Sequence, residues 1–162
     1  MCACILLLAP GKGRKADGGK DDFDGSDAVR PYTPVSDNSV LGKFDLLIKR
    51  YDGGAVSQYL HALPIGAEVS SKHTKFNITA QYPFAGKTTF TLIAAGTGIA
   101  PMYQALWKLM GTAGDNRKVT HSYGNKSPED LLLKEELDGW ARRSAGRLKI
   151  VHGVGNQPAH PA

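Results

Sequence analysis

Residues 88–101 read TTFTLIAAGTGIAP, and this stretch decides the fold of the second half of the chain. Its apolar end, from Leu92 to Ala95, is typical of a strand buried on both faces of a parallel sheet. A glycine-rich turn follows at residues 96–98, and Pro101 stands in the favoured first turn of a helix. Such a turn presents backbone N–H groups to a pyrophosphate. The stretch therefore predicts the start of a nucleotide-binding α/β unit.

The residues that follow continue the same alternation of helix and strand. Their patterns predict a helix over 101–110, a strand over 118–124, a second helix opened by the capping-box pattern of residues 127–130, and a third strand over 148–154. The apolar stripe of the second helix consists of Leu133, Leu137 and Trp140. A β-α-β-α-β run of this kind predicts a partial doubly wound parallel sheet over residues 87–162.

The first half of the chain has a different pattern. Residues 10–28 are rich in Gly, Lys and Asp and predict a loop. Short strands are predicted at 2–8, 29–33, 43–51, 68–71 and 76–79, with a helix over 55–63 that ends at Pro64 and a turn at Gly86. We therefore expect a partial antiparallel β-barrel over residues 1–86.

Arg30, Pro31, Tyr32 and Thr33 form the most informative motif of that half. On an extended segment, Arg30 and Tyr32 point to the same face. A fixed cation beside a flat aromatic ring suits a ligand with both a phosphate and a planar ring. Two phosphate-binding devices of different design predict two nucleotide ligands, and hence redox chemistry.

The composition excludes several other classes of function. The chain has 162 residues, a net charge of +5 and a pI near 9.2, but its 20 Lys and Arg residues are scattered among 15 acids, so we expect no nucleic-acid partner. No apolar run approaches the roughly 20 residues that span a bilayer. Cys2 and Cys4 are the only cysteines, and without further ligands they predict buried thiols in a reducing compartment and no metal site.

The chain resembles NADH–cytochrome b5 reductase and its relatives, the flavin reductases of the ferredoxin–NADP reductase superfamily. The resemblance rests on RPYT at 30–33, LIKRY at 47–51, GGAVSQYL at 53–60, LIAAGTGIAPM at 92–102 and GNKSPEDLLL at 124–133, in family order and at family-like spacing. It implies the two-part fold described above, with FAD held by the first part and NADH by the second.

The same resemblance implies roles for individual residues. Arg30 would pair with the FAD pyrophosphate, Tyr32 would pack on the isoalloxazine ring, and Thr33 would offer a hydrogen bond near flavin N5. Thr97 would lie where nicotinamide and flavin meet, so Thr33 and Thr97 are the candidate catalytic contacts. The remaining cofactor-binding candidates are Pro31, Leu47, Lys49, Gly54, Ala55, Val56, Ser57, Gly96, Gly98, Ala100, Pro101, Met102 and Asp130.

Two of these candidates have an alternative explanation. Asp130 would select NADH by repelling the extra phosphate of NADPH, but it also completes the capping box that begins at Ser127. Lys49 would line the flavin site, or it is a solvated strand lysine. Both explanations stay open for each residue.

The implied function is hydride transfer from NADH to FAD, followed by single-electron transfer to a haem protein such as cytochrome b5. We expect an intracellular monomer without a membrane span in this chain. The resemblance implies membrane anchoring of a full-length protein at the cytoplasmic face of the endoplasmic reticulum or the mitochondrial membrane. The alternatives are the flavin module of a nitrate-reductase-like enzyme and an inactive nucleotide-binding remnant.

The chain departs from the family pattern at several positions. Residues 71–74 replace a Gly-Pro turn, Ala100 replaces a Thr, and His121 and Ser122 interrupt a strand that should be apolar. Burying His121 without a partner would cost about 1–3 kcal/mol. The opening barrel strands and a later Cys-Gly-Pro-Pro segment are not found, so we expect a fragment of a reductase.

Overall fold

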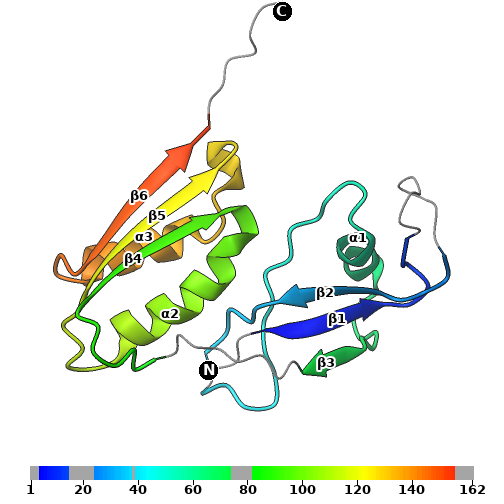
Figure 1. Ribbon diagram of the computed structural model, residues 1–162, viewed down its shortest axis with the longest axis horizontal. Coiled ribbons are helices and arrows are strands. Elements are labelled where there is room, and N and C mark those ends of the chain that lie inside the picture. The colour runs from blue at the N-terminus through cyan, green and yellow to red at the C-terminus, as the bar shows by residue number, and fades with distance from the viewer. Residues whose placement is uncertain (1–3, 15–23, 38, 74–81, 156–162) are drawn as a thin grey trace, which may run out of the picture. The chain divides into compact units, whose positions relative to one another are not determined.

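The computed structural model describes residues 4–14, 24–37, 39–73 and 82–155 (Figure 1). The chain divides into two compact units, Cys2–Ile78 and Thr79–Ala162. The first carries an antiparallel sheet and the second a parallel sheet, as the two sequence patterns predict. The boundary that we predicted after residue 86 remains a prediction.

The sheet of the first unit has the order β2-β1-β3, with β1 (Ile5–Ala9) between β2 (Ala28–Tyr32) and β3 (Ser71–His73). Both pairings are antiparallel. Helix α1 (Ala55–Ala62) contacts β1 and β2, and a small core forms between them from Leu7, Ala9, Ala28 and Val56. Closure of this sheet into a barrel remains a prediction.

The strand predicted over 43–51 is wrong, since these residues form only one isolated bridge, between Pro34 and Leu46. Proline has no N–H to donate to a ladder. The Ser36 hydroxyl accepts a hydrogen bond from the Asp45 N–H at 2.9 Å, in place of a backbone carbonyl. The strand predicted over 68–71 is also displaced, because β3 begins at Ser71, while the predicted strand 76–79 lies outside the described residues.

The sheet of the second unit has the order β4-β5-β6, with β4 at Thr89–Ala95, β5 at Lys118–Asn125 and β6 at Leu148–Val154. All its pairings are parallel. Helices α2 (Ile99–Gly111) and α3 (Lys134–Arg143) contact β4 and β6, and they contact each other where the rings of Tyr103 and Trp140 stack at 4.6 Å. The prediction of a β-α-β-α-β unit is confirmed.

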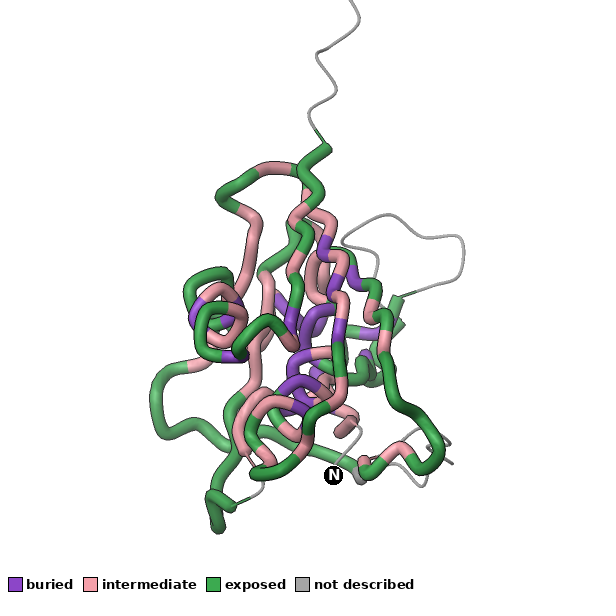
Figure 2. Tube along the Cα trace, turned by 90° about the vertical axis from the view of Figure 1, so that its left-hand side faces the viewer, coloured by how far each residue is buried: buried purple, intermediate pink, exposed green. Residues whose placement is uncertain are grey.

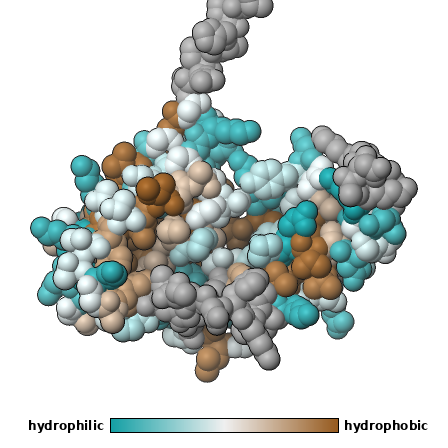
Figure 3. Space-filling model, in the orientation of Figure 1, coloured by the Kyte–Doolittle hydropathy of each residue, from teal (hydrophilic) through white to brown (hydrophobic). Residues whose placement is uncertain are grey.

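The two helices cover one face of this sheet. The core between them and the strands contains Leu106, Leu109, Val119, Tyr123, Leu137 and Leu148 (purple in Figure 2). Along β4, Thr91 and Ile93 point to the opposite face, and Ile93 is 73% exposed. Brown apolar side chains that reach the surface among polar ones are visible in Figure 3.

The second helix does not begin where the capping box predicts. Residues 128–130 form a separate 3-10 turn, η2 (Pro128–Asp130), and α3 begins only at Lys134. Leu133 lies between them in the left-handed region, at φ +57°, which breaks the helical path. The Ser127 hydroxyl is directed to the Asp130 carboxylate, at 3.5 Å. The two side chains of the predicted capping box therefore contact each other and do not cap α3.

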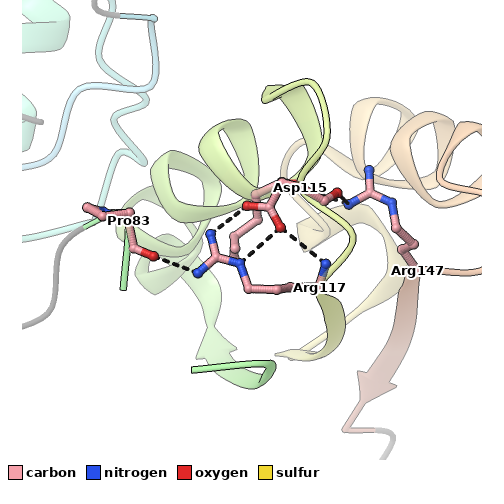
Figure 4. Close-up of polar contacts among 5 residues, drawn as sticks. Pro83, Asp115, Arg117 and Arg147 are labelled. Atoms are coloured by element: carbon pink, nitrogen blue, oxygen red, sulfur yellow. Dashed lines mark hydrogen bonds and ion pairs between the residues drawn. The ribbon is translucent and has the colours of Figure 1, made fainter. Parts of the chain in front are cut away.

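A polar cluster fixes the start of the second unit (Figure 4). The Asp115 carboxylate accepts hydrogen bonds from the Arg117 side chain at 2.5 and 2.9 Å, and Arg117 also donates to the Pro83 carbonyl at 2.5 Å. Arg147 donates to the Asp115 carbonyl at 2.5 Å. The rings of Tyr82, Phe84 and Phe90 surround the Arg117 guanidinium at 5.3 to 6.0 Å. The residues just before β4 are therefore tied to the loop before β5.

Candidate cofactor-binding sites

Arg30 and Tyr32 lie on the face of β2 that Ala28 buries, because the three residues alternate along the strand. The Tyr32 ring packs against the core of the first unit, and this burial raises the pKa of its hydroxyl, while the neighbouring Arg30 charge lowers it. Arg30 is exposed and donates to the Val29 carbonyl at 2.7 Å. The structure therefore places the half-buried Tyr32 ring two residues from the exposed guanidinium of Arg30.

Gly54 is the N-cap residue of α1 and has an extended backbone. The Ser57 side chain stabilises the turn of residues 51–57 through two hydrogen bonds. The buried Ser57 hydroxyl donates to the Gly54 carbonyl at 3.1 Å and accepts from the Tyr51 N–H at 3.3 Å. A Cβ on Gly54 would meet the Ser57 Oγ at 2.4 Å. Glycine is therefore required here, and the Ser57 hydroxyl shapes the turn.

The first turn of α1 fits an anionic ligand. Within the described part of the chain, no side chain caps its N–H groups. Orphan N–H groups and the helix dipole attract phosphate. Ala55 packs against the same core as Tyr32, so the fold brings residues 54–57 to the sheet that carries Arg30.

We expect Gly54→Ala to destabilise the first unit and to weaken FAD binding about tenfold. The new methyl group must displace the Ser57 hydroxyl and break its two hydrogen bonds, at a cost of about 1–3 kcal/mol. Urea unfolding and FAD fluorescence titration measure the two effects. Gly111→Ala is the matched control, since its Cβ would meet its nearest neighbour at 3.7 Å, an ordinary contact. Unchanged FAD affinity in Gly54→Ala would contradict a role of this turn.

The other flavin-binding candidates of the first unit are half-buried or exposed. Leu46 and Ile48 pack on the core of the first unit, and Leu47 and Lys49 beside them are half-buried. Pro31 is exposed at the sheet, and Thr33 is half-buried directly after β2. Arg14 was not among the residues predicted from sequence, and its guanidinium donates to the carbonyl of Gly53, 39 residues away.

The turn at residues 96–98 connects β4 to α2 as a 3-10 helix. Gly96 has φ +50°, and a Cβ added at Gly96 or Gly98 would find no heavy atom within 4 Å. The open space above the turn and the N-terminus of α2 fit a pyrophosphate, since no side chain of the described segments caps this helix start. Thr97 is half-buried in the turn. Among the neighbouring candidates, Ala100 is buried, Met102 is half-buried and Pro101 is exposed.

Tyr123 adds a contact that sequence reasoning missed. Its side chain is 1% exposed, and its hydroxyl donates to the Gly96 carbonyl at 3.1 Å. Ala95 and Gly124 are partners in the parallel ladder, so the ends of β4 and β5 meet at one edge of the sheet. Asp130, half-buried in η2, follows that edge. The nucleotide candidates at 96–98 and 130 therefore gather at the carboxyl ends of adjacent strands, where doubly wound sheets bind ligands.

Comparison with known proteins gives the same division. The chain matches the oxidoreductase FAD-binding domain family over residues 19–78 and the oxidoreductase NAD-binding domain family over residues 92–161. It is 40% identical over 138 residues to NADH-cytochrome b5 reductase 1 of Candida albicans, which covers 85% of this chain and 46% of that protein. The chain belongs to the NADH–cytochrome b5 reductase family.

Another member of the family, NADH-cytochrome b5 reductase 2 of Mycosarcoma maydis, is 37% identical over 161 residues, covering 98% of this chain and 43% of that protein. The chain thus spans less than half the length of these two relatives. The cytochrome b5 reductase domain of Ulva prolifera nitrate reductase has a similar structure, with a TM-score of 0.72 and 26% identity over 99% of this chain and 64% of that one. Ferredoxin-NADP+ reductase from Plasmodium falciparum shares the fold, with a TM-score of 0.72 and 18% identity over 99% of this chain and 59% of its own.

No group of three or more His, Cys, Asp or Glu side chains in the described ranges is arranged to hold a metal ion. Among the helices that the structure describes, none is long and apolar enough to cross a membrane.

Proposed function

We propose that this chain is the cofactor-binding part of an NADH-dependent flavoprotein reductase. When bound, FAD accepts a hydride from NADH and passes electrons singly to a haem protein such as cytochrome b5. One observation carries the proposal. Each unit has a helix that begins at a glycine, Gly54 or Gly98, without a side-chain cap among the described residues, and each of these helix N-termini lies within a matched domain family.

The residues of the first unit would hold FAD. Arg30 neutralises the pyrophosphate, the N–H groups of residues 54–57 donate to it, and Tyr32 offers a ring that is anchored in the core. Leu47 and Lys49 would flank the flavin, and Thr33 would contact its reacting edge. Burial of the Tyr32 ring limits its rotation, which favours one orientation of a stacked ligand.

The residues of the second unit would hold NADH. The turn at 96–98 admits the pyrophosphate because glycine leaves the space above it open. Thr97 would contact the nicotinamide end, Ala100, Pro101 and Met102 would line the site from α2, and Asp130 would lie near the ribose. The chain's own work is binding and orientation, and no side chain needs to act as an acid, base or nucleophile.

The finer parts of the proposal rest on the resemblance. They are closure of the first sheet into a partial barrel, a domain boundary after residue 86, action as a monomer, and anchoring of a full-length protein at the cytoplasmic face of the endoplasmic reticulum or a mitochondrial membrane. The net charge of +5 suits docking of an acidic electron acceptor. A nitrate-reductase module and an inactive remnant are not favoured, because the relatives quoted above are named NADH-cytochrome b5 reductases.

Reconstitution of the purified chain with FAD tests the proposal. We expect one FAD per chain, a yellow protein, and reduction of ferricyanide with NADH in preference to NADPH. A folded protein that binds neither FAD nor NADH would overturn the proposal. Binding of both FAD and NADH without reduction of ferricyanide would support the two binding sites. It would also mean that turnover needs parts of the longer relatives that this chain does not contain.

Asp130 gives a prediction about cofactor choice. We expect Asp130→Ser to improve kcat/KM for NADPH about tenfold while changing that for NADH less than threefold, because a carboxylate repels the extra phosphate. Glu129→Gln, which removes a charge from the adjacent exposed residue, is the control. If Asp130→Ser leaves the ratio of kcat/KM for NADPH to that for NADH unchanged, Asp130 does not select the cofactor, and its contact with Ser127 has a structural role.

A further inference from the structure

His121 is the only histidine that the structure describes with 0% exposure, and its ring has one satisfied and one unsatisfied nitrogen. Nδ1 lies 3.2 Å from the Leu92 carbonyl, so Nδ1 carries the hydrogen, since a carbonyl only accepts. Nε2 is buried and finds no hydrogen-bond partner among the described residues. A second proton would therefore have to enter a position with no acceptor and little water.

The ring of His121 is stacked on the ring of Tyr123, the residue whose hydroxyl donates a hydrogen bond to the turn at residues 96–98. Its centroid lies 5.8 Å from that of Tyr123, with an angle of 15° between the planes. Tyr123 is almost fully buried, and its hydroxyl holds the Gly96 carbonyl. The ring that would be disturbed when His121 becomes hydrated is therefore the one whose hydroxyl holds the turn.

The charges around His121 oppose its protonation. On β6, His152 lies beside Tyr123 in the ladder and its charge disfavours a second cation. His152 is itself bonded to Asp138 of α3 at 3.1 Å, and Asp138 is paired with Lys134. On α2, Tyr103 is buried with a raised pKa, chiefly through burial, and stays neutral. Burial is the main cause that lowers the pKa of His121; the hydrogen bond to the Leu92 carbonyl acts in the opposite direction, and His152 lowers the pKa further.

We propose that Tyr123 is a positioning residue for the Gly96–Gly98 turn and that protonation of His121 releases this turn, so that acid weakens pyridine-nucleotide binding. The proposal rests on the function proposed above for the turn. A group whose folded pKa is depressed stabilises the native arrangement above its unfolded pKa, near 6.5, and this stabilisation is lost as the pH falls through the folded value. The loss therefore begins just below neutral pH.

Titration of the FAD-loaded chain with NAD+ at pH 7.5 and pH 5.5 tests the proposal. We expect the dissociation constant of the wild-type protein to rise about fivefold or more on acidification. His121→Leu should remove most of this rise and leave the value at pH 7.5 nearly unchanged. Tyr123→Phe should weaken binding at both pH values and reduce the effect of pH, because the link to Gly96 is gone. His61→Gln, at an exposed position of the first unit, should behave as wild type.

Hydrogen exchange of the amides of residues 96–99, corrected for the intrinsic effect of pH, gives a readout that needs no nucleotide. Protection should fall at pH 5.5 in the wild type but not in His121→Leu. If His121→Leu keeps the wild-type response in exchange, the proposal is overturned. A wild-type chain that never binds NAD+ would refute the function proposed for the turn, and exchange would still decide whether His121 controls it.

Discussion

Replacing Arg30 with Glu should abolish tight FAD binding while the protein stays folded. Arg30 is exposed on β2, and its observed hydrogen bond goes to the neighbouring Val29 carbonyl, so the fold does not depend on its charge. Reversing that charge removes a charge-assisted bond worth about 1.5–3 kcal/mol and adds repulsion of the phosphates. We expect the dissociation constant for FAD to rise at least about a hundredfold.

Quenching of flavin fluorescence measures the affinity, and circular dichroism verifies the fold. Arg142→Glu is the matched control, since Arg142 is exposed in the last turn of α3 in the other unit. Arg30→Lys should restore part of the affinity, because an ammonium keeps the charge but loses the bidentate geometry. If Arg30→Glu binds FAD within threefold of the wild type, Arg30 does not contact the phosphates.

Replacing Asp115 with Asn should lower the unfolding free energy of the second unit. The Asp115 side chain is 4% exposed and that of Arg117 is 19% exposed, so the substitution leaves the Arg117 guanidinium without its counter-charge. We expect a loss clearly larger than that of a substitution at an exposed carboxylate without such a pair. Chemical denaturation, followed by the fluorescence of Trp107 and Trp140, reports on this unit.

The same variant should change the response to acid. Hydrogen bonds from Arg117 lower the pKa of Asp115 to about 2. Its contribution to stability is therefore complete above about pH 3.8 and is lost as the pH falls toward 2. Asp115→Asn should be less sensitive to pH in that interval than the wild type. Glu135→Gln, exposed in the first turn of α3, is the control, and equal stability of Asp115→Asn and this control would exclude the cluster as a stabilising element.

The units of the fold were predictable where one face of an element is buried along its length. The strand predicted over 118–124 is confirmed, with Val119, His121 and Tyr123 buried along it. The strand at the apolar end of 88–95 is confirmed too, but the expectation that both of its faces are buried was wrong, because Ile93 is 73% exposed. The predicted strand at 43–51 failed because its pairing stops after the single bridge between Pro34 and Leu46, where the Asp45 N–H bonds to the Ser36 side chain and not to a backbone carbonyl. The predicted start of α3 failed because Leu133 adopts a left-handed backbone, which the helical pattern does not reveal.

The sequence by itself determined the two kinds of sheet, the glycine-rich turns and the family, because periodicity, glycine and short motifs act over a few neighbouring residues. Only the tertiary structure showed that Tyr123 bonds to Gly96, that Arg14 bonds to Gly53, and that His121 is buried with an unpaired nitrogen. The partners in these bonds are 27 and 39 residues apart, and local pattern carries no information about which distant groups meet. That choice is made when strands pair and helices pack, because packing decides which distant polar groups come within hydrogen-bond reach and which buried ones, such as Nε2 of His121, are left without a described partner.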